Sequence, residues 1–146
     1  MVPLTEISAE TIVNSSLERI WKYWTEPKHI MKWNNISEDW HTPKVQNELS
    51  VGGKLFFRME TKDGTEGFDH TGTYDNIQIH EKISYTTGDG RKATIFFFNT
   101  EQGVRLLEVF EIPGTDDPQF HQSFCQAILN NFKTYVENEV NSCSNE

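Results

Sequence analysis

The sequence has few cysteines and no long apolar run. It contains two cysteines, Cys125 and Cys143, whereas small secreted domains held together by disulfides carry more. No cationic and apolar segment of the signal-peptide kind opens the chain, and no apolar run approaches the roughly 20 residues that cross a bilayer. We therefore expect a cytoplasmic location, a buried Cys125 that behaves as a small apolar residue, and an exposed free thiol at Cys143.

Basic side chains are also scarce. The 13 lysines and arginines are outnumbered by 22 acidic residues, which gives a formal net charge of −9. No cluster of Lys or Arg offsets this excess locally, and a negative surface repels phosphate backbones and anionic lipid headgroups. These numbers argue against nucleic acids and membrane surfaces as partners.

Motifs for metals, nucleotides and nucleophilic catalysis are missing as well. The five histidines show no paired spacing and the cysteines form no C-x-x-C motif. There is no G-x-G-x-x-G, Walker loop, G-x-S-x-G or H-E-x-x-H motif, and the pair Gly52 and Gly53 precedes a predicted strand rather than a helix. We expect no metal and no organic cofactor.

The length of 146 residues favours one domain with a single core, which we place at residues 1–140, followed by a polar tail at 141–146. Near the N-terminus, alternating apolar residues predict a strand over residues 7–14. Ser15 and Glu18 then form a capping box that opens a helix. Glu26 and Pro27 end it, and a short second helix over residues 28–33 follows. The polar segment 34–43 is expected to be irregular.

The middle of the chain alternates in the manner of strands. Segments beginning at Leu55 and Gly67, and the segments 82–87, 93–99 and 104–112, are predicted strands separated by glycine-containing turns. The run 95–98 is apolar at every position, which predicts a central strand covered on both faces. A wide apolar stripe with i, i+4 spacing predicts a long helix over residues 118–140.

This order predicts an α+β protein. The simplest architecture is a curved antiparallel sheet of six to seven strands around the long C-terminal helix, with two short helices after the first strand. A strongly curved sheet cannot press flat against a straight helix. The space between them is therefore either filled by large side chains or left as a cavity.

Four segments also resemble a known family. LERIWKYWTEP at residues 17–27 with IMKW at 30–33, VGGKLFFRM at 51–59, GTYDNI at 72–77 and QAILNNFK at 126–133 resemble, in order, the motifs of homologues of the activator of the heat-shock-protein-90 ATPase. The resemblance implies the helix-grip fold of the START/polyketide-cyclase (SRPBCC) superfamily, and it suggests a chaperone partner and a role in stress response. The chain departs from the family pattern at Asn34, where a second tryptophan is common, and at Glu108, where the family has an apolar residue.

Glu108 is the least expected residue of the last predicted strand. It shares strand parity with Val104, Leu106, Phe110 and Ile112, so it should point the same way as these apolar side chains. If that face looks inward, a carboxyl group lies in the cavity, where burial raises its pKa and makes it a candidate acid or base. The alternatives are a bulge that turns Glu108 outward and a salt bridge with a neighbouring strand.

For His70 and the tryptophans, too, both a functional role and a packing role are possible. His70 lies between Phe68 and Gly72 on a mostly apolar face, as a candidate general base or as a hydrogen-bonded core histidine. The four tryptophans fall between residues 21 and 40. Trp33, Trp40 and the neighbouring His41 either form an aromatic lid or plug one end of the core, whereas Trp21 and Trp24 follow the helical apolar stripe and are expected to pack.

Three functions are compatible with these patterns. The first is binding of a small hydrophobic molecule, lipid-like or aromatic, in a cavity between sheet and helix. The second is a co-chaperone-like protein that acts through its surface, and the third is a cyclase- or hydratase-type enzyme using Glu108 and His70, with Tyr74 or Tyr85 as donors. A monomer or a homodimer fits all three. The expected ligand-binding residues are Trp33, Trp40, Phe57, Met59, Phe68, His70, Tyr74, Phe98, Glu108, Phe110, Phe124 and Ile128.

Overall fold

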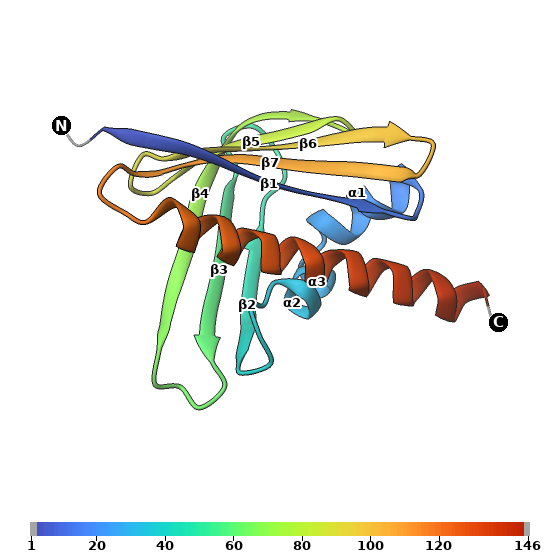
Figure 1. Ribbon diagram of the computed structural model, residues 1–146, viewed down its shortest axis with the longest axis horizontal. Helices are drawn as coiled ribbons and strands as arrows, with labels where there is room; N and C mark the ends of the chain where they lie inside the picture. Colours follow the sequence, from blue (N-terminus) through green and yellow to red (C-terminus); the bar gives the residue numbers. More distant parts are fainter. Residues whose placement is uncertain (1–2, 145–146) are drawn as a thin grey trace.

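The computed structural model describes residues 3–144, with side chains described for residues 3–139. Seven strands and three helices follow in the predicted order (Figure 1). They are β1 (Leu4–Val13), α1 (Leu17–Thr25), α2 (Pro27–Trp33), β2 (Trp40–Asn47), β3 (Lys54–Thr61), β4 (Gly67–Gln78), β5 (Lys82–Thr87), β6 (Lys92–Thr100), β7 (Gly103–Pro113) and α3 (Pro118–Ser144).

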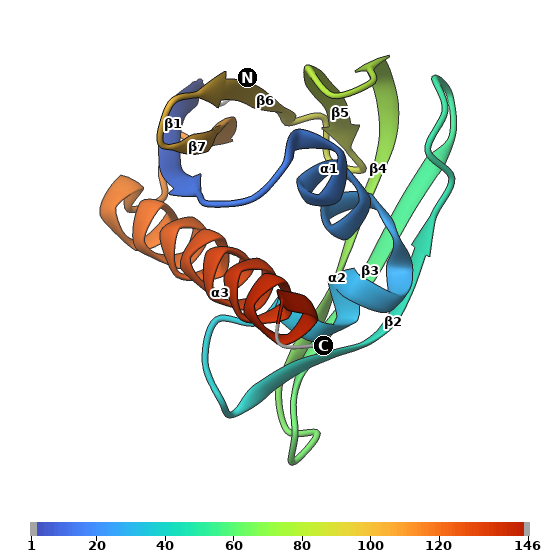
Figure 2. The ribbon, with the colours of Figure 1, turned by 90° about the vertical axis from the view of Figure 1, so that its right-hand side faces the viewer.

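The strands form one antiparallel sheet in the order β1-β7-β6-β5-β4-β3-β2. The sheet curls around α3, with β1 and β2 at its two edges (Figure 2). The first strand of the chain pairs with the last one, from Leu4 opposite Pro113 to Val13 opposite Val104. The predicted α+β architecture, a curved sheet around a long C-terminal helix, is confirmed.

Some element boundaries differ from the prediction. The segment 34–43, expected to be irregular, contains the start of strand β2, which runs from Trp40 to Asn47 and pairs with β3. The pairing slips between His41 and Lys44, around Pro43. Pro43 has no N–H to donate, and the segment shows no clear apolar alternation, so its residue pattern carried no signal of a strand there. At the other end, α3 continues beyond Val140 through Ser144. The thiol predicted to be exposed, Cys143, has a side chain outside the described part of the chain.

Helix α1 is capped one residue later than predicted. The cap is Ser16, with an extended backbone (φ −73°, ψ 151°), and its hydroxyl accepts a hydrogen bond from the Arg19 N–H at 3.2 Å. The Ser15 N–H still donates to the Val13 carbonyl at 3.0 Å, so the chain is turning away from β1 at that residue. Ser15 therefore belongs to the turn, and Glu18 stands in the first helical turn without completing the predicted capping box.

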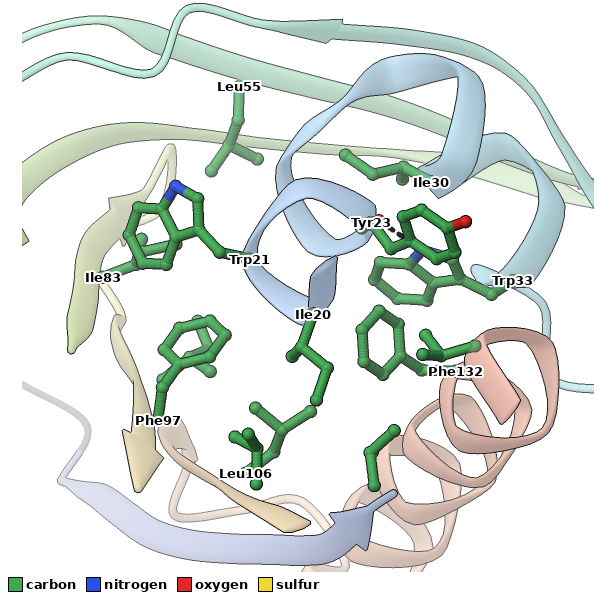
Figure 3. Close-up of a cluster of buried hydrophobic side chains, with 14 of the residues drawn as sticks. Ile20, Trp21, Tyr23, Ile30, Trp33, Leu55, Ile83, Phe97, Leu106 and Phe132 are labelled. Carbon is green, nitrogen blue, oxygen red and sulfur yellow. Dashed lines mark hydrogen bonds between the residues drawn. The ribbon is translucent and has the colours of Figure 1, made fainter. Parts of the chain in front are cut away.

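The solid part of the core lies under the C-terminal half of α3. The rings of Trp24 and Trp33 stack with centroids 4.8 Å apart, and Phe132 meets them edge-on at 5.0 and 4.9 Å. Trp33 Nε1 donates to the Tyr23 carbonyl at 2.9 Å. In Figure 3 the labelled rings of Tyr23, Trp33 and Phe132 gather beside Ile20, with this hydrogen bond dashed. These contacts fix α1, α2 and α3 to one another.

The outer face of the sheet is open to solvent. Phe98 on β6 is 41% exposed, although its neighbour Phe97 is buried. The prediction of a strand covered on both faces is therefore wrong, because β6 is central in the sheet but has a layer on its inner side only. None of the helices within residues 3–144 is long and apolar enough to cross a lipid bilayer.

Phe132 and Phe120 lie on the same helix and differ in burial, fully buried against 64% exposed. We expect Phe132→Ala to lower the free energy of unfolding by about 3–5 kcal/mol, because it removes a ring packed on two indoles and leaves a void. Phe120→Ala should lower it by about 0.5 kcal/mol or less. Urea denaturation measures both, and equal losses would contradict this assignment of the core.

Candidate functional site

A cavity of about 700 Å³ lies between the concave face of the sheet and the N-terminal half of α3. It borders the aromatic core just described, since Trp24 and Trp33 line it as well. The sheet contributes residues from β2 to β7, and α3 contributes its first turns. Of the residues predicted from sequence, those that line the cavity are Trp33, Trp40, Phe57, Met59, Phe68, His70, Tyr74, Glu108, Phe110, Phe124 and Ile128.

Phe98 is the exception and is not part of the cavity wall. Along β6 the residues Ala93, Ile95 and Phe97 are buried on the inner face, so strand alternation puts Phe98 on the outer face. Its ring is covered there by the Arg105 guanidinium, 5.5 Å from the ring centroid. The apolar run 95–98 concealed this alternation.

Ala93 is the smallest side chain at the centre of the cavity wall. In the sheet register it lies between Tyr85 on β5 and Phe110 on β7. All three line the cavity, and a methyl group between two rings leaves a hollow in the wall. Sequence reasoning missed this position because one alanine in a strand carries no signal of its own. It also assigned Trp24 to packing alone, whereas Trp24 packs and lines the cavity at once.

Glu108 points into the cavity, and neither the bulge nor the salt bridge considered from sequence occurs there. Its neighbours in the register are Ala9 on β1 and Ile95 on β6. Its Oε1 accepts a hydrogen bond from Cys125 Sγ on α3 at 2.8 Å. Burial raises the pKa of the Glu108 carboxyl, and the Cys125 hydrogen bond opposes this only in part. Cys125 is buried as expected, but it acts as a polar partner.

His70 on β4 forms a second polar pair with Tyr85 on β5. His70 Nε2 and the Tyr85 hydroxyl lie 3.2 Å apart, and the His70 ring is 5.8 Å from that of Phe57. Burial, with Arg91 nearby, lowers the pKa of His70 to about 4, so the imidazole is neutral at physiological pH. Burial, followed by the nearness of Glu108, raises the pKa of Tyr85 well above its usual value.

Tyr74 completes the polar groups of the wall. Its hydroxyl donates to Asn47 Oδ1, and Asn47 Nδ2 in turn donates to the Thr25 carbonyl at 2.7 Å. These two hydrogen bonds tie β4 and β2 to the end of α1. Burial raises the pKa of Tyr74, so its hydroxyl keeps its proton and is already used inside the protein.

A row of aromatic rings borders the cavity between β2, β4 and α3. The ring centroids of Trp40 and Phe68 are 6.1 Å apart, those of Phe68 and Phe124 are 6.4 Å apart, and those of Phe124 and Phe120 are 6.4 Å apart. Phe68 is 40% exposed and Phe120 is 64% exposed. His41, considered with Trp40 as part of a lid, is not in the cavity wall and faces Glu60 at 3.5 Å.

The arrangement offers hydrogen bonds rather than metal chemistry. Within residues 3–139 no three His, Cys, Asp or Glu side chains are grouped so that they could hold a metal ion. Among the polar side chains of the wall are two hydrogen-bonded pairs, Glu108 with Cys125 and His70 with Tyr85. Both pairs border the same cavity, and in the sheet register β6 separates Tyr85 on β5 from Glu108 on β7.

The lowered pKa of His70 predicts a pH-dependent stability. His70 takes up a proton near pH 6.5 in the unfolded chain and near pH 4 in the folded protein. The contribution of His70 to stability is therefore fully present above pH 6.5 and is lost as the pH falls toward 4. This part of the loss should reach about 3 kcal/mol. In His70→Gln this pH-dependent loss should disappear. Glu108 contributes in the opposite sense in both proteins, so its contribution cancels in the difference between them. Urea denaturation at a series of pH values measures the free energy of unfolding of each protein, and parallel curves for the two would refute the prediction.

Comparison with known proteins agrees with this geometry. The family model described as activator of Hsp90 ATPase homolog 1-like protein matches residues 14–137. A search of curated proteins gave no match.

Solved structures are similar over nearly the whole chain. The solution structure of an AHSA1-like protein from Aeromonas hydrophila is 36% identical, with a TM-score of 0.87, over 92% of this chain and 94% of that one. A protein from Cytophaga hutchinsonii is 43% identical, with a TM-score of 0.79, over 93% and 94%. A protein from Chromobacterium violaceum, 22% identical with a TM-score of 0.80 over 90% and 96%, shares the fold. As its sequence motifs predicted, the chain belongs to the family of activator of Hsp90 ATPase homolog 1-like proteins.

Proposed function

We propose that this protein binds a small hydrophobic molecule inside the cavity between the sheet and α3. The observation that carries the proposal is the cavity itself. Its volume of about 700 Å³ falls within the range of about 300–1,000 Å³ that is typical of small-molecule sites. Protein interiors are ordinarily close-packed, so a hollow of this volume lined by large aromatic side chains is suited to hold a ligand.

The character of the wall supports an apolar ligand. Its inner surface is formed mainly by aromatic and aliphatic side chains from β3 to β7 and from α3. Two pairs of its polar groups, His70 with Tyr85 and Glu108 with Cys125, are hydrogen-bonded to each other, which lowers the cost of keeping them in an apolar space. A ligand of this kind gains affinity by removing apolar surface from water, about 25 cal/mol per Å².

The exposed aromatic rings give such a ligand a way in. Trp40, Phe68, Phe120 and Phe124 border the cavity, and Phe68 and Phe120 reach the surface. These rings are tilted against one another, with centroids 6.1–6.4 Å apart. Side chains held in this manner change rotamers readily, so we expect entry between α3 and the β2–β4 edge.

Filling the cavity from Ala93 tests the proposal. The probe is Nile red, a neutral apolar dye whose emission shifts to the blue in an apolar site. We expect it to bind the native protein, and we expect Ala93→Phe to weaken binding at least tenfold, or about 1.4 kcal/mol, because the new ring occupies the space between Tyr85 and Phe110. Fluorescence titration gives both affinities.

The matched control is Thr94→Phe, which adds the same ring to the same strand on its outer face. It should leave the affinity for Nile red within about twofold, since alternation keeps that side chain out of the cavity. Urea denaturation confirms that both variants fold. The proposal fails if Nile red does not bind the native protein, or if both variants bind it as the native protein does.

A second candidate function follows from the family. The matching model carries the name of an activator of the Hsp90 ATPase, which suggests that this chain contacts that chaperone. The measurement is the ATPase rate of a purified Hsp90 with increasing amounts of this protein. A severalfold increase that persists in Ala93→Phe would assign the effect to the outer surface rather than to the cavity, and an unchanged rate at high concentration would exclude direct activation.

A further inference from the structure

Glu108 is the feature of the cavity that ligand hydrophobicity does not explain. Its Oε1 accepts from Cys125, and a thiol is a weak donor. Its second carboxyl oxygen has no hydrogen-bond partner within the described part of the chain, and the side chain lines the cavity. A carboxyl group in an apolar site is costly unless it is paired. An apolar side chain at the same position would complete the cavity lining without the free-energy cost of burying an unpaired carboxyl group.

In the described part of the chain, no cationic side chain is paired with Glu108. From β1 and β6 it faces Ala9 and Ile95, and from α3 it faces Cys125. The titratable groups of β4 and β5 on this wall are His70, Tyr74 and Tyr85, none of which carries a charge at neutral pH given their shifted pKa values.

Within residues 3–139, none of the basic side chains at the cavity mouth forms a salt bridge with Glu108. Arg91 binds Asp89 through Nε at 2.8 Å, and His121 Nε2 lies 2.9 Å from the Asp116 carboxylate. Lys92 lies on β6 three residues before Ile95, the register partner of Glu108, and its backbone N–H donates to the Glu111 carboxylate at 2.7 Å. Inside the cavity, among residues 3–139, the carboxyl of Glu108 is therefore without a protein counterion.

The rest of the wall suits a positive charge. Tyr85, Phe110 and Phe124 line the cavity together with Glu108, and Trp24 packs against the cluster of Ala9, Cys125 and Leu129 beside it. The faces of aromatic rings attract cations, by about 2 kcal/mol or more when water is excluded. The formal net charge of −9 also favours the approach of cations over anions.

We infer that the cavity takes a ligand with an ammonium group on an apolar frame, and that Glu108 is its counterion. This inference rests on the proposed function, because it specifies the class of molecule that enters the same cavity. The apolar frame fills the space next to Ala93 and the aromatic wall. The ammonium group donates to the free oxygen of Glu108 and lies against the neighbouring rings.

Binding of such a ligand is coupled to a proton. Burial raises the pKa of the Glu108 carboxyl in the empty cavity and so favours its protonated form. The ligand arrives as an ammonium ion, a protonated carboxyl gives its proton to the buffer, and the complex holds the carboxylate and the ammonium as a pair. Binding therefore releases up to one proton for each ligand, and affinity rises with pH until the empty protein loses that proton unaided.

Three probes of nearly equal shape separate the possibilities: 2-(1-naphthyl)ethylamine, 2-(1-naphthyl)ethanol and 1-naphthylacetic acid. Calorimetric titration is carried out in two buffers of different ionisation enthalpy. We expect the amine to bind most tightly and the acid least, and only the amine to release a proton. In Glu108→Gln, the amine should lose roughly 30-fold in affinity and its proton release, while the alcohol should stay within about threefold.

The control variant is Glu101→Gln, which removes one negative charge from the exposed turn between β6 and β7 and should change none of the three affinities by more than about twofold. The inference is overturned if the alcohol or the acid binds the native protein as tightly as the amine, or if Glu108→Gln keeps the amine affinity. Binding of the alcohol alone would leave the proposed function standing. If neither Nile red nor any of the three probes binds, both fail together.

Discussion

The structure depends on the mismatch between a curved sheet and a straight helix. Helix α3 packs on the edge strand β1 and on α1 and α2. Its C-terminal half is fixed by Phe132, which lies against Trp24 and Trp33. The inner strands bend away from the N-terminal half, and Ala93 widens the gap. The same helix is therefore a core element at one end and a cavity wall at the other.

The polar groups of the cavity follow from this geometry. A carboxyl, an imidazole, a phenol and a thiol lie on one apolar wall, and each is shifted toward its neutral form because burial penalises charge. They satisfy one another in pairs, His70 with Tyr85 and Glu108 with Cys125. Such a wall holds hydrogen-bonding capacity without a fixed charge, so the charge state of the site is set by what enters it.

The sequence predicted the fold and most of the residues that line the cavity. Strand alternation put Phe57 and Met59 on inner faces correctly, because one face of each strand is buried and the period of two is strict; for Glu108 it left the inward direction as one of three alternatives. The same rule failed at Phe98, where an unbroken apolar run gives no parity. Strand β2 was missed because its pairing slips at Pro43, and Tyr85 and Cys125 gained their roles only from tertiary neighbours. Ala93 acts through its small size, which depends on what surrounds it.

The pairing of β1 with β7 has a consequence for how the chain reaches this structure. Leu4 meets Pro113 and Val13 meets Val104, so the first strand leaves the ribosome long before its only neighbour in the sheet is made. Contacts so distant in sequence slow folding, because a long loop must close before they form. Helix α3, which rests on β1, docks later still. The nascent chain thus holds an unpaired amphipathic strand until synthesis is nearly complete, and the cavity is among the last features to be enclosed.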